Sequence, residues 1–145
     1  MSDSPILANG LVRHFGSGAN IVKAVDGVSV QVRAGQTLGV VGESGCGKST
    51  LARLLMRLLP PTSGTVLLDG ADITSLTGRE LRAVRAKIQM VFQDPVASLN
   101  PRHSVGQIIG TPLKFLKENS VTGAREHVQE LMALVGLNPE HYNRY

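Results

Sequence analysis

The sequence predicts an α/β fold, and three features of the chain indicate it. Residues 37–41 form a short apolar run, which is typical of a strand buried on both faces of a sheet. A glycine-rich loop follows at 42–47, and leucines at helical spacing fill residues 48–59. Before this run, valines alternate with polar residues over 28–33, as in a half-buried antiparallel strand. A strand, a glycine loop and an apolar helix in this order are typical of an α/β protein.

Glycine and proline mark the boundaries of the first elements. Residues 5–15 are predicted to form a strand because their apolar side chains alternate loosely with polar ones, and a glycine-rich break at 16–18 ends it. The two prolines at 60–61 end the predicted helix, since a proline inside a helix lacks the backbone N–H that the helix needs. The helix is therefore expected to extend to about residue 59.

Short strands and a helix are predicted next. Residues 65–68 form a strand, and Asp69-Gly70 is a hairpin-type turn. Residues 77–80 have the spacing of a capping box, in which two side chains satisfy each other's backbone N–H groups at the start of a helix. We expect that helix to run to about Arg85 and a further strand to form at 88–92.

The last third of the chain is predicted to consist of loop and helix. Residues 93–102 hold two prolines and two turn-forming Asn or Asp residues, which indicates a loop. Residues 104–107 form a second capping box, which begins a helix that Pro112 disturbs. Apolar residues at helical spacing over 128–135 indicate a last helix, and Gly136 ends it.

The composition indicates one globular domain and excludes several other classes of protein. The chain has 145 residues, of which 42% are hydrophobic and 18% charged, and this length can bury a core. No stretch of 18 residues is free of charge, which excludes a spanning helix, and the N-terminus shows no signal peptide. The single cysteine, Cys46, excludes an internal disulfide and a zinc site with several cysteines. We therefore expect a cytoplasmic protein.

The net charge of +4 raises the question of an anionic partner. Lys and Arg total 15 against 11 acidic residues, but the basic residues are scattered along the chain. Aromatic residues do not interleave with them, as a surface for single-stranded nucleic acid would need. We therefore expect no nucleic-acid partner, whereas a phosphate ligand needs only one local site.

The strongest functional signal is the phosphate-loop motif G-x-x-x-x-G-K-[ST], which residues 42–49 match. Its glycines let the backbone turn tightly so that successive N–H groups face a phosphate, and the start of the following helix adds partial positive charge. Lys48 is expected to reach the β- and γ-phosphates, Ser49 to coordinate Mg²⁺, and Thr50 to add a hydroxyl near the α-phosphate. Cys46 is expected to fill space without a redox role. The predicted nucleotide contacts in this segment are Gly42, Glu43, Ser44, Gly45, Cys46, Gly47, Lys48, Ser49 and Thr50.

Two segments of the chain resemble a known family. Val40–Leu51 resembles the Walker A segment of ATP-binding cassette (ABC) ATPases. Gln89–Arg102 resembles the Q-loop of the ATPase subunits of oligopeptide and dipeptide importers, a subfamily that includes nickel importers, and Ser98–Arg102 is its most subfamily-specific part. The resemblance covers nearly the whole chain. It implies a P-loop NTPase core with an N-terminal antiparallel β subdomain and the start of a helical subdomain, and it implies ATP and Mg²⁺ as ligands.

The resemblance also gives roles to two residues outside the phosphate loop. Gln93 matches the Q-loop glutamine, which in the family touches Mg²⁺ or the attacking water and links the site to the transmembrane partner; the alternative is a polar residue that ends a strand. Phe15 matches the aromatic residue that stacks on adenine, where the family more often has Tyr, and core packing of the first strand is an equally open alternative. We expect a nucleotide-binding core with the β subdomain at 1–93, and a Q-loop continuation with a partial helical subdomain at 94–145.

The function that the resemblance implies is ATP hydrolysis that drives the uptake of peptides or similar small solutes. Such a protein would lie peripherally on the cytoplasmic face of the cell membrane. Its expected partners are transmembrane permease subunits and a second ATPase subunit, identical or different.

Several parts of a complete ABC ATPase are not found in the sequence, namely the signature, the Walker B strand, the D-loop and the switch histidine. The chain therefore resembles the N-terminal part of a longer protein, cut before the signature, and we expect the isolated chain not to hydrolyse ATP. In the family, strands of the remaining part complete the sheet around residues 37–41. Two alternatives stay open: a nucleotide-binding fragment that never hydrolyses, and a compact P-loop NTPase or kinase in which Asp94 is the Walker B carboxylate.

Overall fold

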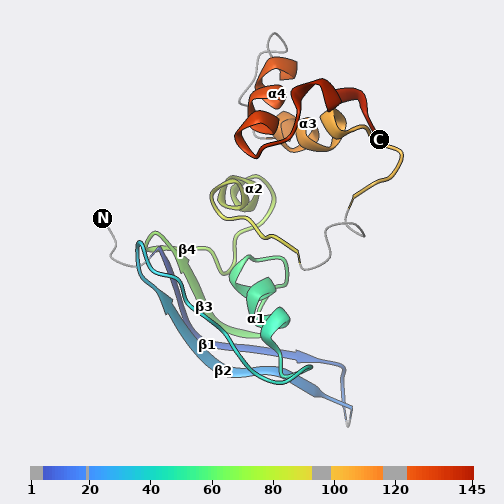
Figure 1. Ribbon diagram of the computed structural model, residues 1–145. Helices are drawn as coiled ribbons and strands as arrows, with labels where there is room; N and C mark the ends of the chain where they lie inside the picture. Colours follow the sequence, from blue (N-terminus) through green and yellow to red (C-terminus); the bar gives the residue numbers. More distant parts are fainter. Residues whose placement is uncertain (1–4, 19, 93–98, 116–123) are drawn as a thin grey trace. The chain divides into compact units, whose positions relative to one another are not determined.

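The computed structural model describes residues 5–18, 20–92, 99–115 and 124–145, and the chain divides into two compact units, Met1–Gln89 and Met90–Tyr145 (Figure 1). The first unit contains β1 (Ile6–Phe15), β2 (Val22–Val32), α1 (Lys48–Leu55), β3 (Ser63–Leu68), β4 (Ala71–Asp72) and α2 (Gly78–Lys87). The second unit contains α3 (Val105–Phe115), α4 (Ala124–Leu134) and the 3-10 helix η2 (Pro139–Asn143).

The first unit is built on an antiparallel sheet with the strand order β2-β1-β3-β4. The predicted strands at 5–15, 28–33 and 65–68 are confirmed, and β2 begins six residues earlier than expected, at Val22. The hairpin turn between β3 and β4 is also confirmed, because Asp69 (φ 51°) and Gly70 (φ 81°) both adopt the left-handed backbone conformation that such a turn needs. The antiparallel β subdomain is therefore present.

Helix α1 closes the core of this unit against the sheet. Its buried side chains are Leu51 and Leu54, which pack with buried residues of β1, β2 and β3 and with Ile73. Burial of leucine, valine and isoleucine side chains is worth about 1.5–3 kcal/mol each, so this layer is the main source of stability for the unit. The buried core residues are Ala8, Leu11, Val25, Leu51, Leu54, Val66, Leu68 and Ile73.

Helix α1 is shorter than predicted, because it ends at Leu55 and not near residue 59. Arg57 follows with a left-handed backbone (φ 51°), and the N–H groups of Arg57 and Leu58 donate to the carbonyls of Leu54 (3.0 Å) and Arg53 (2.9 Å). This is a Schellman motif, which usually has glycine at the left-handed position. Contacts distant in sequence hold Arg57 there, and the helix ends before its prolines are reached.

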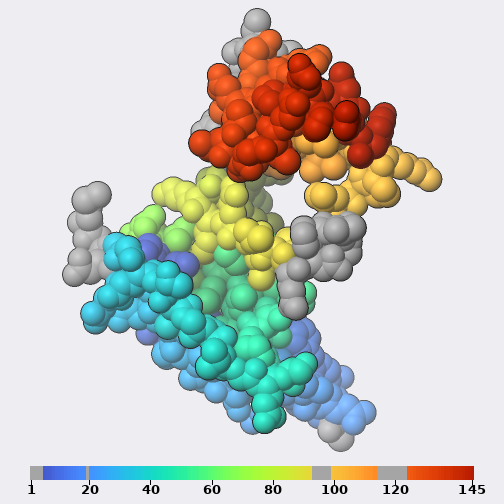
Figure 2. Space-filling model, in the orientation of Figure 1, coloured from blue at the N-terminus to red at the C-terminus, as the bar shows by residue number. Residues whose placement is uncertain are grey.

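The predictions of strands at 37–41 and 88–92 are wrong. Neither segment is a strand in the structure, and their side chains are largely exposed, with Val41 at 93% and Val91 at 96%. A strand forms only where another strand accepts its backbone hydrogen bonds, and no described segment pairs with either run. Figure 2 shows the segment that follows β2, drawn in cyan, at the molecular surface.

The two predicted capping boxes behave differently. In the second unit, the Ser104 N–H donates to Gln107 Oε1 (2.9 Å), and the Gln107 N–H donates to Ser104 Oγ (3.3 Å), so that this box is confirmed at the start of α3. Thr77 begins α2 as predicted, but its side chain makes no capping hydrogen bond. The spacing therefore predicted both helix starts correctly, but the reciprocal side-chain hydrogen bonds of a capping box form only at the start of α3.

The second unit is a small helical assembly. Helix α3 continues past Pro112 to Phe115, and α4 ends at Leu134, two residues before the predicted stop at Gly136, which has φ 78°. The η2 segment lies against α3 because Gly106 leaves room for the ring of Tyr142, which a Cβ at 106 would overlap. Among the described residues, no helix is long and apolar enough to cross a membrane.

Candidate phosphate-binding site

The predicted phosphate loop connects an irregular segment to the start of α1. Residues 42 and 43 have no regular structure, residues 44–47 are turn and bend, and α1 begins at Lys48 with Gly47 as its N-cap. The backbone N–H groups of a first helical turn lack partners inside the helix, and together they carry partial positive charge. No acidic residue lies in the first turn of α1, so this charge is available to an anion.

Gly47 is the position in the loop where a side chain would be least tolerated. Its backbone is left-handed (φ 97°), and a Cβ there would collide with the carbonyl oxygen of Ala24 in β2. Gly42 also lacks room, since a Cβ would come within 2.8 Å of Cys46 Sγ. Gly47 therefore allows the loop to approach the sheet closely, and Gly42 allows the loop backbone to approach the side chain of Cys46.

The side chain of Lys48 turns back over the loop. Its Nζ donates to the carbonyl oxygens of Gly42 (2.7 Å) and Glu43 (2.5 Å), and it lies 3.6 Å from Cys46 Sγ. Both oxygen partners are neutral carbonyls, whereas a phosphate oxygen carries negative charge and attracts the ammonium more strongly. An anion that enters the loop can therefore compete for this ammonium.

The remaining predicted contact residues lie together around this loop. The side chains of Glu43, Ser44, Cys46 and Ser49 are exposed, and Thr50 is half-buried. A ligand can therefore reach the hydroxyl of Ser49 from solvent. Among the described residues there is no group of three His, Cys, Asp or Glu side chains that could hold a metal ion.

Phe15 ends β1, opposite Val22 of β2. Its ring is 37% exposed and lies outside the buried core, and the guanidinium of Arg13 sits 4.7 Å from the ring centroid. This side chain is accessible to a planar group on the surface. Gln93 and Asp94, the two other predicted site residues, lie outside the described residues.

Sequence reasoning missed the part that β2 takes in this site, namely the carbonyl of Ala24 against Gly47. The valine pattern of β2 carries a signal for this. Val25 and Val28 both pack in or against the core although they lie three residues apart, and Gly27 lies between them. Side chains in a regular strand alternate between faces, and an isolated glycine in a strand suggests a bulge. The broken alternation could have located an irregular strand beside the loop.

Comparison with known proteins identifies the family. The sequence profile of the ABC transporter family matches residues 25–145, which include the phosphate loop, most of the first unit and the whole second unit. This chain belongs to the ABC transporter family. An ATP-binding cassette fold agrees with the observed P-loop, antiparallel β subdomain and helices. In this ABC chain, the first 24 residues contribute β1 and the beginning of β2.

Two curated relatives indicate the subgroup. The chain is 50% identical over its whole length to a probable peptide ABC transporter ATP-binding protein, y4tS of Sinorhizobium fredii, of which it covers 43%. It is 52% identical, over 86% of its length, to the oligopeptide transport ATP-binding protein AppF of Bacillus subtilis, of which it covers 38%. The ABC chain therefore spans less than half the length of these relatives.

Solved structures show the same fold. The ATP-binding cassette MJ0796, in a dimeric post-hydrolysis state bound to ADP and Pi, superposes with a TM-score of 0.82 at 26% identity, covering 95% of this chain and 60% of that one. A second dimeric structure of MJ0796, described as a bacterial ABC transporter cassette, gives a TM-score of 0.78 at 27% identity, with 90% and 56% covered. The predicted fold class is thereby confirmed.

Proposed function

We propose that this chain binds ATP and Mg²⁺ at residues 42–50, as the nucleotide-binding part of a peptide importer's ABC ATPase. The observation that carries the proposal is the position of Lys48, whose ammonium is held on two neutral carbonyls at the start of α1. A helix start without acidic residues and a loop with tightly approaching glycines support it, because both favour close contact between backbone N–H groups and a phosphate.

Each side chain of the site has a role in this proposal. Lys48 exchanges its carbonyl partners for β- and γ-phosphate oxygens, and Thr50 adds a hydroxyl near the α-phosphate. Ser49 contributes one hydroxyl to Mg²⁺, and Gln93 contributes a further oxygen or orients water. Mg²⁺ supplies charge neutralisation for phosphoryl transfer when it is bound. Phe15 stacks on adenine, which its exposed ring permits.

The function of the whole protein is also a proposal. Relatives described as peptide and oligopeptide transport ATP-binding proteins support ATP hydrolysis coupled to the uptake of peptides or similar solutes. MJ0796 is dimeric, which supports a second ATPase subunit as a partner. Transmembrane permease subunits would complete the assembly and hold the protein on the cytoplasmic face of the membrane. Catalysis there is positioning and charge stabilisation, and this chain alone is expected not to turn over ATP.

Replacing Lys48 tests the proposed nucleotide site. A charge-assisted contact contributes about 1.5–3 kcal/mol, so Lys48→Ala should weaken ATP binding by about 10- to 150-fold. AMP should be affected much less, because it lacks the β- and γ-phosphates that Lys48 contacts. Calorimetric titration of both nucleotides measures the difference. Lys87→Ala, which removes an exposed lysine at the end of α2, is the matched control and should leave both affinities unchanged. Equal ATP affinity in Lys48→Ala and wild type would refute the proposal.

A further inference from the structure

We propose that Asp26 is a positioning residue for the phosphate loop, because it stabilises the bulge in β2 that contacts Gly47. The proposal depends on the nucleotide-binding function proposed above, and it assigns a supporting part to side chains on the outer face of the sheet. Three observations carry it: an unpaired residue in β2, an ion-pair cluster that needs this residue, and the contact between the same residue and the loop.

The first observation is the bulge in β2. Arg13 of β1 pairs with Val25, and the next residue, His14, pairs with Lys23. Ala24 is therefore an extra residue that faces no partner on β1. Bulges of this kind bend a strand and are frequent beside functional sites.

The second observation is that Lys23 and Asp26 make an ion pair, which a regular strand would not permit. They lie three residues apart, and side chains at odd separations point to opposite faces of a regular strand. The extra residue Ala24 reverses this relation, so that both side chains lie on the solvent face while Val25 stays in the core. The ion pair thus requires the bulge, and it favours the bulge in return.

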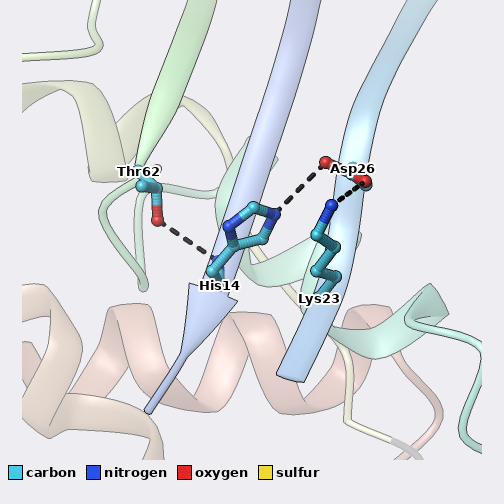
Figure 3. Close-up of polar contacts among 4 residues, drawn as sticks. All are labelled: His14, Lys23, Asp26 and Thr62. Carbon is cyan, nitrogen blue, oxygen red and sulfur yellow. Dashed lines mark hydrogen bonds and ion pairs between the residues drawn. The ribbon is translucent and has the colours of Figure 1, made fainter. Parts of the chain in front are cut away.

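A histidine completes this cluster from the neighbouring strand (Figure 3). Asp26 Oδ1 lies 3.2 Å from His14 Nε2, and Asp26 Oδ2 accepts a hydrogen bond from Lys23 Nζ at 3.3 Å. The hydrogen bonds from His14 and then from Lys23 hold the pKa of Asp26 below its usual value. One carboxylate therefore joins the two residues that pair directly beside Ala24.

The third observation connects the bulge with the loop. The carbonyl oxygen of Ala24 lies so close to Gly47 that no Cβ would fit between them, and the side chain of Val25 borders the same position. Gly47 is the N-cap of α1 and precedes Lys48. A shift of Ala24 would therefore move the residue that sets the direction of the first N–H groups of the helix.

The cluster is also tied to the other end of α1. The backbone N–H of His14 donates to Thr62 Oγ1 at 3.2 Å (Figure 3). Arg13 Nη1 donates to the carbonyl of Pro60 at 3.0 Å. Both acceptors belong to the segment that leads from α1 into β3. The strand register around Ala24 is thus connected with both ends of the helix that begins at the site.

The test uses Asp26→Asn, which keeps the size of the side chain and removes its charge. Exposed ion pairs are weak, so we expect ATP affinity to fall about two- to fivefold while adenosine affinity stays unchanged. In the protein without nucleotide, amide hydrogen exchange at Gly47 and Lys48 should accelerate at least about twofold relative to the core strands. Asp26→Glu, which keeps the carboxylate, should restore both values.

A matched control is available in the second unit, where Glu130 forms another exposed pair with His127 at 3.5 Å. Glu130→Gln should change neither quantity. Lys23→Met removes only one partner of Asp26 and should act in the same direction with a smaller effect, which keeps the test valid if Asp26→Asn folds poorly.

The outcomes separate the two proposals. If the wild type does not bind ATP, the nucleotide-binding function fails, and the exchange rates at Gly47 and Lys48 still decide the role of Asp26. If Asp26→Asn lowers the unfolding midpoint but leaves exchange at these two residues and the preference for ATP over adenosine unchanged, Asp26 is only structural. That result, or no change at all, overturns the positioning role.

Discussion

The two ends of helix α1 each bring a basic side chain to backbone carbonyl oxygens, yet their surroundings are opposite. At the start, Lys48 donates to two carbonyls of an exposed loop. At the end, Arg57 is only 7% exposed and donates to the carbonyls of Ile73 (2.9 Å), Leu76 (3.3 Å) and Leu59 (3.5 Å). Burial lowers the pKa of Arg57 below its ordinary value, and the nearby charge of Arg85 adds to this effect.

The difference shows how one helix can bind a ligand at its start and be anchored to the rest of the unit at its end. An exposed ammonium can leave its carbonyls for a phosphate oxygen, because water replaces the lost contacts at little cost. A buried guanidinium cannot leave, because each carbonyl would lose its partner where water does not reach. The start of α1 is therefore suited to exchange ligands, and its end fastens the helix to the segment that precedes α2.

The backbone conformations at the two ends differ in the same way. Gly47 and Arg57 are both left-handed, with φ of 97° and 51°. For the glycine this conformation is free of steric cost, whereas for the arginine it is unfavourable. The end of α4 shows the ordinary solution, since Gly136 (φ 78°) occupies the left-handed position and the Leu137 N–H donates to Met132 O at 2.8 Å.

Removing Arg57 should give the largest effect on stability. Arg57→Ala leaves buried carbonyls without partners and keeps a left-handed residue, so we expect unfolding free energy to fall by about 2–4 kcal/mol. Urea denaturation measures this value. Arg57→Gly should recover about 1 kcal/mol of the loss by relaxing the backbone.

A matched control for Arg57 is Arg53, which lies one turn earlier, inside α1. Arg53 is exposed, and Arg53→Ala should change the unfolding free energy by no more than about 0.5 kcal/mol. If the two alanine variants proved equally stable, the hydrogen bonds of Arg57 would not be what ends and fastens α1.

Adding a side chain at Gly47 should act mainly on the binding end. The collision with the Ala24 carbonyl and the left-handed backbone cost about 1–3 kcal/mol together. Because the loop must shift to relieve this strain, ATP affinity in Gly47→Ala should fall at least about tenfold. Fluorescence titration with a nucleotide analogue measures it.

Gly136→Ala is the comparison at a helix end without a proposed ligand. Nothing lies within 4 Å of a Cβ at Gly136, so the only cost of an alanine there is its left-handed backbone conformation. We expect a loss of about 1 kcal/mol in stability and an unchanged ATP affinity. Retained ATP binding in Gly47→Ala would mean that the loop does not use the observed conformation when it binds.

Alkylation of Cys46 should show the smallest effect, and it tests whether the binding end closes on its ligand. The thiol is exposed and lies 3.6 Å from Lys48 Nζ. At an ATP concentration ten times the Kd, about nine-tenths of the protein is occupied, so alkylation should slow about tenfold if bound nucleotide shields the loop. Rates with adenosine should equal those without ligand. An unchanged rate under saturating Mg-ATP would contradict the proposed site.

Much of the fold follows from local patterns in the sequence. The alternation at 28–33, the hairpin turn at Asp69-Gly70 and the stop at Gly136 each depend on the conformational preference of a few adjacent residues. The phosphate loop follows from the spacing of its glycines and lysine for the same reason, since the motif encodes a local backbone path. These features could be read without any knowledge of tertiary contacts.

Other features were decided only by residues far apart in the chain. The apolar runs at 37–41 and 88–92 have strand-like composition, but pairing depends on a second segment, and the described part of the chain supplies none. Helix α1 ends at Leu55 because Arg57 donates hydrogen bonds to the carbonyls of Ile73 and Leu76. These two residues are too distant in sequence for the local pattern around the helix to reveal the contact.

The support of the phosphate loop belongs to the same class. Its glycines predict a tight turn, but the carbonyl that makes Gly47 indispensable comes from Ala24, at a bulge that the register with β1 produces. Sequence spacing determined which residues can meet a phosphate, because that geometry is local. The tertiary structure decided what holds those residues in place, because a strand register exists only between two strands.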